Sequence, residues 1–245
     1  MESEHSVRIT KDMDTNQKQE QPKPKDELKT RFVELLQATG REGIDGLIEN
    51  LTKLGFFIAP ASTKYHCAEV GGLCRHSLCV YDQARAIRKA ELELHPELED
   101  RLPIESIAIA ALLHDICKAE IYKPCTRNRK NEATGQWEKY WTWEAEYDHC
   151  PMGHGEKSVI RILTNGVKLT PDEMMAIRWH MGAWDLPDSF EAKGNLGAAC
   201  EKSPLLDVIM AADELATRVT EVLYEKQKKD DEEANDKEKK EEGQK

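Results

Sequence analysis

The chain has 245 residues, with 46 acidic and 35 basic side chains and a formal net charge of −11. A chain of this length can bury a substantial core. Its acidic balance argues against non-specific binding to duplex DNA, where Lys and Arg must neutralise phosphates. No apolar run approaches the roughly 18 to 20 residues that a membrane helix requires, so we expect no membrane span.

The two ends of the chain differ in composition from its centre. Residues 1–26 and 226–245 lack apolar periodicity and are rich in Glu, Lys, Gln and Asp, which predicts disordered tails around a single domain at 27–225. The first thirty residues contain no apolar segment of the kind that a secretory signal needs. Seven scattered cysteines without a C-x-x-C pair indicate reduced thiols, so we expect a cytoplasmic protein.

Between the tails, apolar residues recur mostly at helical spacing. Gly40 and Gly55 end the first two apolar stripes, and Pro96 follows the end of a long third one. Pro171 and Pro204 suit the first turn of a helix. The expected helices cover 28–36, 44–54, 72–94, 104–117, 155–163, 171–180 and 204–224. The helix at 104–117 has an almost entirely apolar centre, and we expect it to form the buried middle of an all-α fold.

Residues 121–147 break the helical pattern. The turn-like sequence 133–136 separates two extended runs, which predicts a β-hairpin inserted between helices. Its basic residues are Lys123, Arg127, Arg129 and Lys130, and its aromatic residues include Trp137, Tyr140, Trp141 and Trp143. Cations and aromatic faces together suit a nucleotide or a single strand. Arg127 and Arg129 are therefore candidate substrate-binding residues, and the alternative is an amphipathic hairpin packed on the core.

Polar residues in apolar surroundings point to a metal site. His114 and Asp115 directly follow the apolar run 109–113, and Asp213 lies within the apolar stretch 205–215. A buried carboxylate is costly unless it is paired or bound to a metal. Imidazole and carboxylate are typical ligands of transition metals, so one metal site would explain all three positions.

Three further histidines complete a candidate ligand set. His76, His154 and His180 each lie in or beside an expected helix, although a single histidine of this kind is more often a hydrogen-bonded core residue. His149 competes with His154, which we prefer because the glycines beside it permit close backbone approach. Four histidines and two aspartates are too many for one four-coordinate ion and suit two ions bridged by a carboxylate.

The order His76, His114-Asp115, His154, His180 and Asp213 resembles the HD superfamily of metal-dependent phosphohydrolases, over about residues 65–224. The resemblance implies an HD-domain helical bundle with two divalent transition-metal ions, whether Fe, Mn, Zn, Ni or Co. By the same resemblance, His76, His114 and Asp213 hold the first ion, His154 and His180 hold the second, and Asp115 bridges them.

The resemblance also implies catalytic roles for Asp115 and Lys118, with Lys118 beside the substrate phosphoryl group. The alternative for Lys118 is a solvated position at a helix end, interacting with the helix dipole. His66 resembles a cleft residue of HD exonucleases, and ordinary packing is its alternative. Cys117 stands where the family often has Gly.

The implied activity is hydrolysis of a phosphate monoester or diester in a small phosphorylated substrate, a nucleotide or a short nucleic-acid end. The same residue order on the same fold also occurs in dinuclear non-haem iron oxygenases. A non-catalytic nucleotide sensor is disfavoured because all six ligand types are present. The sequence lacks the Gly-Tyr-Pro-type motif of cyclic-dinucleotide phosphodiesterases, which argues against a cyclic dinucleotide as the substrate. Its first 60 residues lack the OB-fold pattern of some HD exoribonucleases, which argues against processive RNA degradation.

Overall fold

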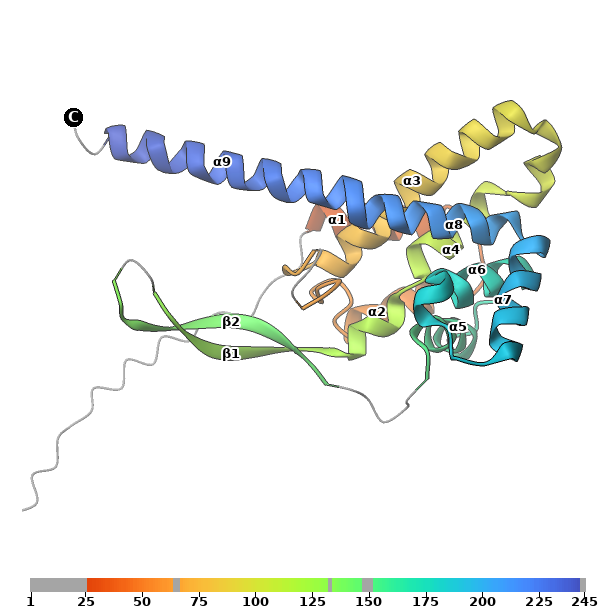
Figure 1. The fold of residues 1–245 in the computed structure, drawn as a ribbon, viewed down its shortest axis with the longest axis horizontal. Coiled ribbons are helices and arrows are strands. Elements are labelled where there is room, and N and C mark those ends of the chain that lie inside the picture. The colour runs from red at the N-terminus through yellow and green to blue at the C-terminus, as the bar shows by residue number, and fades with distance from the viewer. Residues whose placement is uncertain (1–25, 64–66, 132–133, 147–151, 243–245) are drawn as a thin grey trace, which may run out of the picture.

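The computed structural model describes residues 26–63, 67–131, 134–146 and 152–242. These residues are mainly helical and include one two-stranded antiparallel sheet, as Figure 1 shows. The predicted helical fold with an inserted hairpin is confirmed at this level, whereas the predicted tail at 1–26 lies almost wholly outside the described residues. No helix in the described part is long and apolar enough to cross a bilayer, and the six described cysteines are free thiols.

The helices of the described part are α1 (Asp26–Gln37), α2 (Ile44–Lys53), α3 (Gly72–Leu94), α4 (Ile104–Leu113), α5 (His154–Thr164), α6 (Pro171–Trp179), α7 (Phe190–Lys202), α8 (Pro204–Leu215) and α9 (Glu221–Glu242). Short 3-10 turns form η1 (Pro96–Arg101), η2 (Ile116–Glu120) and η3 (Gly182–Asp185), and η4 (Ala216–Thr220) is a π-helical segment. The strands are β1 (Tyr122–Lys130) and β2 (Trp137–Ala145).

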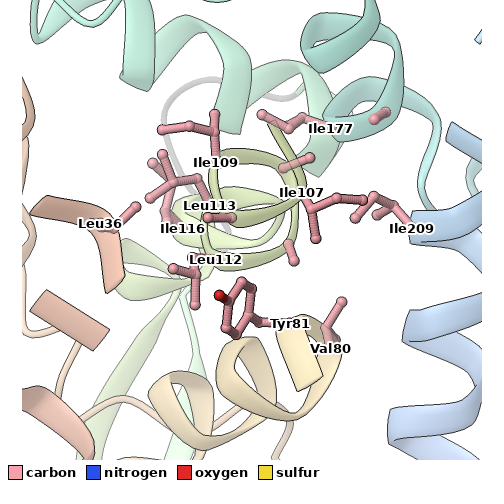
Figure 2. Packing of buried hydrophobic residues seen from close by; sticks show 14 of the residues in the cluster. Leu36, Val80, Tyr81, Ile107, Ile109, Leu112, Leu113, Ile116, Ile177 and Ile209 are labelled. Carbon is pink, nitrogen blue, oxygen red and sulfur yellow. The ribbon is translucent and has the colours of Figure 1, made fainter. Parts of the chain in front are cut away.

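Helix α4 is the buried centre of the fold, as its apolar sequence predicts. Every residue from 106 to 113 is buried, and α4 contacts α1, α3, α6 and α8. Figure 2 shows side chains of α4 surrounded by Tyr81 from α3, Ile177 from α6 and Ile209 from α8. Full burial of such an apolar side chain contributes about 1.5–3 kcal/mol to the free energy of unfolding. The packing around α4 therefore holds the four neighbouring helices in place.

The helix expected at 104–117 ends earlier than predicted. α4 stops at Leu113, and Asp115 has φ −114° and ψ 15°, outside the helical region, before the η2 turn begins. Consecutive residues within an α-helix point about 100° apart. Because the helix breaks between them, His114 and Asp115 are released from that constraint and can approach a common centre.

The C-terminal part differs most from the sequence-based expectation. The single helix predicted at 204–224 is interrupted by η4, and residues 226–242, for which the sequence predicts a disordered charged tail, are helical in α9. Lys and Glu are good helix formers, so intrinsic propensity can maintain a helix without an apolar stripe. Lys228 Nζ also lies 2.8 Å from Glu69 Oε2, which ties the start of α9 to the loop before α3.

Helix α7 is absent from the predicted set. Only Ala199 within it is fully buried, so its sequence carries no apolar stripe. The helix begins where Ser189 Oγ accepts a hydrogen bond from the Ala192 backbone N–H, a standard N-cap.

The hairpin forms where the sequence predicts it. β1 and β2 pair in antiparallel register from Tyr122 opposite Ala145 to Lys130 opposite Trp137. Figure 1 shows the two strands extending away from the helical body. Trp143, near the base, is buried, whereas Trp137, near the tip, is 72% exposed.

A buried ion pair fixes α6 relative to α4. Glu173 is fully buried and accepts two hydrogen bonds from Arg41, at 2.8 and 2.9 Å, and one from Ser106 on α4 at 2.7 Å. Glu173 also forms a capping box with Thr170 at the start of α6. His180 follows the C-terminal end of α6, so the hydrogen bonds of Glu173 help to determine where that histidine lies.

Candidate metal centre

The six predicted ligands converge in one buried cluster, although they come from five separate helices or their ends. His76 Nε2 lies 3.2 Å from both His114 Nε2 and Asp213 Oδ1. On the other side of the cluster, Asp115 Oδ1 lies 3.5 Å from His180 Nε2 and 3.9 Å from His154 Nε2. The predicted set is therefore brought together in full, whereas His66 and His149 lie outside the described residues.

Two glycines permit the close packing that brings the ligands together. A Cβ on Gly155 would lie 2.4 Å from the carbonyl oxygen of Arg178, so α5 can approach the end of α6 only with glycine there. This approach places His154, the first residue of α5, beside His180. A Cβ on Gly72 would lie 1.9 Å from the carbonyl oxygen of Cys67, so the start of α3 is packed as closely.

Three of the four imidazoles have a hydrogen-bond partner on Nδ1. His114 Nδ1 donates to the Ala111 carbonyl and His180 Nδ1 to the Ile177 carbonyl, both at 2.8 Å. A carbonyl only accepts, so the proton must be on Nδ1, and Nε2 of the neutral ring is available as a ligand atom. Partners of this kind orient metal-binding histidines and raise their basicity.

A carboxylate takes the same role at His76, and a second carboxylate lies near His154 beyond hydrogen-bond distance; the sequence did not reveal either. Glu221 is buried, and its Oε1 lies 2.7 Å from His76 Nδ1. Asp185 Oδ2 lies 3.7 Å from His154 Nδ1. Glu221 is the first residue after the π-helical segment η4, which shifts the face of the following helix. No local sequence pattern identifies Glu221, because its position beside His76 depends on this change in the helix.

Burial and charge act against each other in the cluster. Burial opposes charge on Asp115, but Lys118 and the adjacent histidines hold the pKa of its carboxyl well below the ordinary value. Burial likewise opposes charge on His76, but Asp213 and Glu221 outweigh it and raise the pKa of His76 to about 10. The carboxylates therefore draw positive charge into the site.

Several buried ligand atoms have no hydrogen-bond partner in the described part of the chain. Asp115 Oδ1, His154 Nε2 and His180 Nε2 are buried without a hydrogen bond. Unsatisfied buried polar atoms are rare in native proteins, and each is costly. Two groups, His76 with His114 and Asp213 and His114 with Asp115 and His180, have ligand atoms within 4.8 Å of one another. Nitrogen and carboxylate oxygen in this arrangement fit a transition-metal ion.

A pocket of about 250 Å³ opens onto the cluster. His76, Asp115 and Asp213 line its floor together with Lys118, whose Nζ lies 2.6 Å from Asp115 Oδ2. The remaining lining residues are Met181, Trp184, Glu214, Thr217 and Arg218. Lys118 is thus an ion-paired pocket residue rather than a solvated helix end. Neither Trp184 nor Arg218 could be selected from the sequence, because neither stands in a motif.

The basic hairpin residues do not line this pocket. Arg129 is ion-paired with Glu138 at 2.7 Å and lies over the ring of Tyr140, and Arg127 is exposed on β1. Lys123 and Trp143 line a separate cavity of about 670 Å³ at the hairpin base. The basic strip, expected beside the site, therefore does not line the described pocket, because the hairpin projects away from the helices that form it.

Comparisons with protein-family models, curated proteins and solved structures found no match. The function of the chain has to be inferred from the site itself.

Proposed function

We propose that this chain is an HD-type phosphohydrolase, which binds two divalent transition-metal ions and hydrolyses a phosphate ester. The observation that carries the proposal is the set of buried ligand atoms on Asp115, His154 and His180 that make no hydrogen bond within the described residues, beside the His76, His114 and Asp213 group. A buried cluster of four imidazoles and two carboxylates has little structural value without a cation to compensate it.

The geometry of Asp115 supports two ions rather than one. Its Oδ2 faces His114 and His76, at 3.3 and 3.7 Å. Its Oδ1 faces His180 and His154, at 3.5 and 3.9 Å. A carboxylate with one oxygen toward each histidine pair suits a bridging ligand. His76, His114 and Asp213 would then hold one ion, and His154 and His180 the other.

The pocket supports phosphate as the reacting group. When bound, ions of this kind activate water and neutralise charge that develops on a phosphoryl group. Lys118 contributes a cation at the pocket floor, and the Asp115 carboxylate raises the pKa of its ammonium despite burial. The lysine therefore stays charged at neutral pH, and it can hold an outer phosphoryl oxygen while it orients Asp115.

Metal analysis followed by a substrate panel tests the proposal. Protein purified without chelator should contain about two transition-metal ions per chain, and should hydrolyse at least one of a panel of phosphomonoesters and phosphodiesters. Metal-replete protein that hydrolyses none of them would contradict the proposal. An Fe(II)/Fe(III) signal in electron paramagnetic resonance, with oxygen uptake on substrate, would instead assign the chain to the dinuclear oxygenases.

A further inference from the structure

The wall of the pocket carries an exposed tryptophan. Trp184 lies on η3, lines the pocket and is 77% exposed. Single exposed apolar residues are ordinary on protein surfaces. This one differs because it borders a cavity whose floor is a cluster of metal-ligand residues, where an aromatic face can meet a bound molecule.

The segment that carries Trp184 is firmly attached to the site. Gly182 has a φ of +52°, and a Cβ there would lie 2.7 Å from Met210 Cε, so η3 packs closely on α8. The next residue, Asp185, lies 3.7 Å from His154 Nδ1. Trp184 therefore lies in a backbone segment between His180 and Asp185, which places its exposed ring beside the cluster.

The opposite wall supplies one further cation. Arg218 lies on η4, with its side chain 66% exposed, and forms an ion pair with Glu214. Among the described lining residues, Lys118 and Arg218 are the lysine and arginine side chains. A nucleic-acid strand requires a groove of cations that follows its backbone. Two such cations beside a small cavity, with the acidic Glu214 also in its lining, instead suit a compact ligand with one phosphate.

We propose that the substrate is a nucleoside monophosphate. Its base stacks on Trp184, its phosphate lies beside Lys118 at the cluster, and Arg218 provides a second cation at the pocket mouth. Hydrolysis would break the ester P–O bond and form a new P–O bond to the oxygen of water. A proton from the water would pass to the leaving oxygen, so that nucleoside and inorganic phosphate are released. This inference rests on the proposed function and narrows its substrate class.

The first test compares two tryptophans of similar exposure. Trp184→Ala should raise the KM for AMP roughly 5- to 150-fold, the value of one lost base stack, and should raise that for ribose 5-phosphate much less. Trp137→Ala removes a ring that is 72% exposed on the hairpin, and should change neither value. Trp184→Phe should recover part of the AMP affinity because its ring still stacks.

A binding measurement makes the test independent of turnover. Adenosine should quench tryptophan fluorescence in the wild type and in Trp137→Phe, but much less in Trp184→Phe. The second comparison pairs Arg218→Ala with Arg129→Ala, because their guanidinium side chains are 66% and 63% exposed and each is paired with a glutamate. Arg218→Ala should weaken AMP and ribose 5-phosphate alike, whereas Arg129→Ala should affect neither.

The outcomes separate this inference from the proposed function. If Trp184→Ala changes AMP and ribose 5-phosphate equally, or if Trp137→Ala is the variant that weakens AMP, the stacking role is overturned while phosphate-ester hydrolysis still stands. If Trp184→Ala changes neither substrate, the exposed ring serves another contact and the inference is overturned too. If no ester is hydrolysed but Trp184 still reports adenosine, the nucleoside pocket is retained and the hydrolase proposal fails.

Discussion

The candidate metal centre and the β1–β2 hairpin both concentrate polar and charged side chains, yet they are built in opposite ways. The cluster gathers residues as distant as His76 and Asp213 into a buried centre. The hairpin gathers neighbours along the chain, and its charges pair locally and remain exposed, as Arg129 does with Glu138. Composition alone marks both regions, but only the first has ligand atoms that lack partners among the described residues.

The difference has an energetic cause. An exposed ion pair contributes roughly 0–1 kcal/mol, so the hairpin charges need no ligand to be tolerated. A buried carboxylate loses its hydration and must be compensated by cations or hydrogen bonds. Asp115 has such compensation on Oδ2 from Lys118, whereas its Oδ1 has no hydrogen-bond partner in the described structure. An incompletely compensated buried charge is therefore a stronger sign of function than an exposed basic strip.

The largest effect is expected at Asp115. Asp115→Ala removes both oxygens that face the histidine pairs, and should abolish metal content and hydrolysis while the protein stays helical by circular dichroism. Metal analysis and the ester assay measure this. Asp207→Ala is the matched control, since it removes an exposed carboxylate from α8. Two ions retained per chain in Asp115→Ala would refute the bridging role.

A smaller effect is expected at Lys118. Lys118→Ala removes a cation from the pocket floor, and should reduce turnover by a factor on the order of 10², the usual effect of losing one strong electrostatic contact. Metal content, measured on the same preparation, should remain close to wild type. Lys123→Ala, at an exposed lysine paired with Glu146, serves as the control. Wild-type turnover in Lys118→Ala would restrict this lysine to a structural role.

Glu221 should act on metal affinity more than on turnover. Glu221→Gln keeps the shape of the side chain but weakens the contact to His76 Nδ1, which lies 2.7 Å from the carboxylate. Loss of such a partner typically costs 10- to 100-fold in metal affinity. Titration of metal-free protein with Zn²⁺ should show the loss at one ion, whereas Glu225→Gln on the same helix should bind as wild type. Unchanged affinity in Glu221→Gln would show that the carboxylate does not tune the site.

The smallest effect is expected in the hairpin. The sequence predicts that replacing both Arg127 and Arg129 with Ala raises the KM for nucleotides, whereas their position outside the pocket predicts little change. Measuring this KM at low and high salt decides between the two expectations, because a lost charge attraction would appear at low salt. A clear rise for nucleotides, without one for p-nitrophenyl phosphate, would make the hairpin part of the substrate site.

Local sequence patterns determined much of the fold. The long helix at 72–94 was predicted with its observed ends because Gly71 precedes it and Pro96 follows it. The hairpin was predicted from its turn, and the burial of α4 from its apolar centre. The six metal-ligand candidates could be selected because polar residues in apolar helices demand an explanation, and their order resembled one family.

Only the tertiary structure decided the details on which the chemistry depends. The break after Leu113 frees Asp115 from the helix, the π-helical segment places Glu221 against His76, and η3 presents Trp184 at the pocket. Residues 226–242 carry no apolar periodicity in the sequence, yet they are helical in α9, where propensity without burial can maintain a helix. Hydrophobic periodicity shows which face of a helix is buried. The contacts above depend instead on how separate helices pack against one another, and no short stretch of sequence encodes that packing.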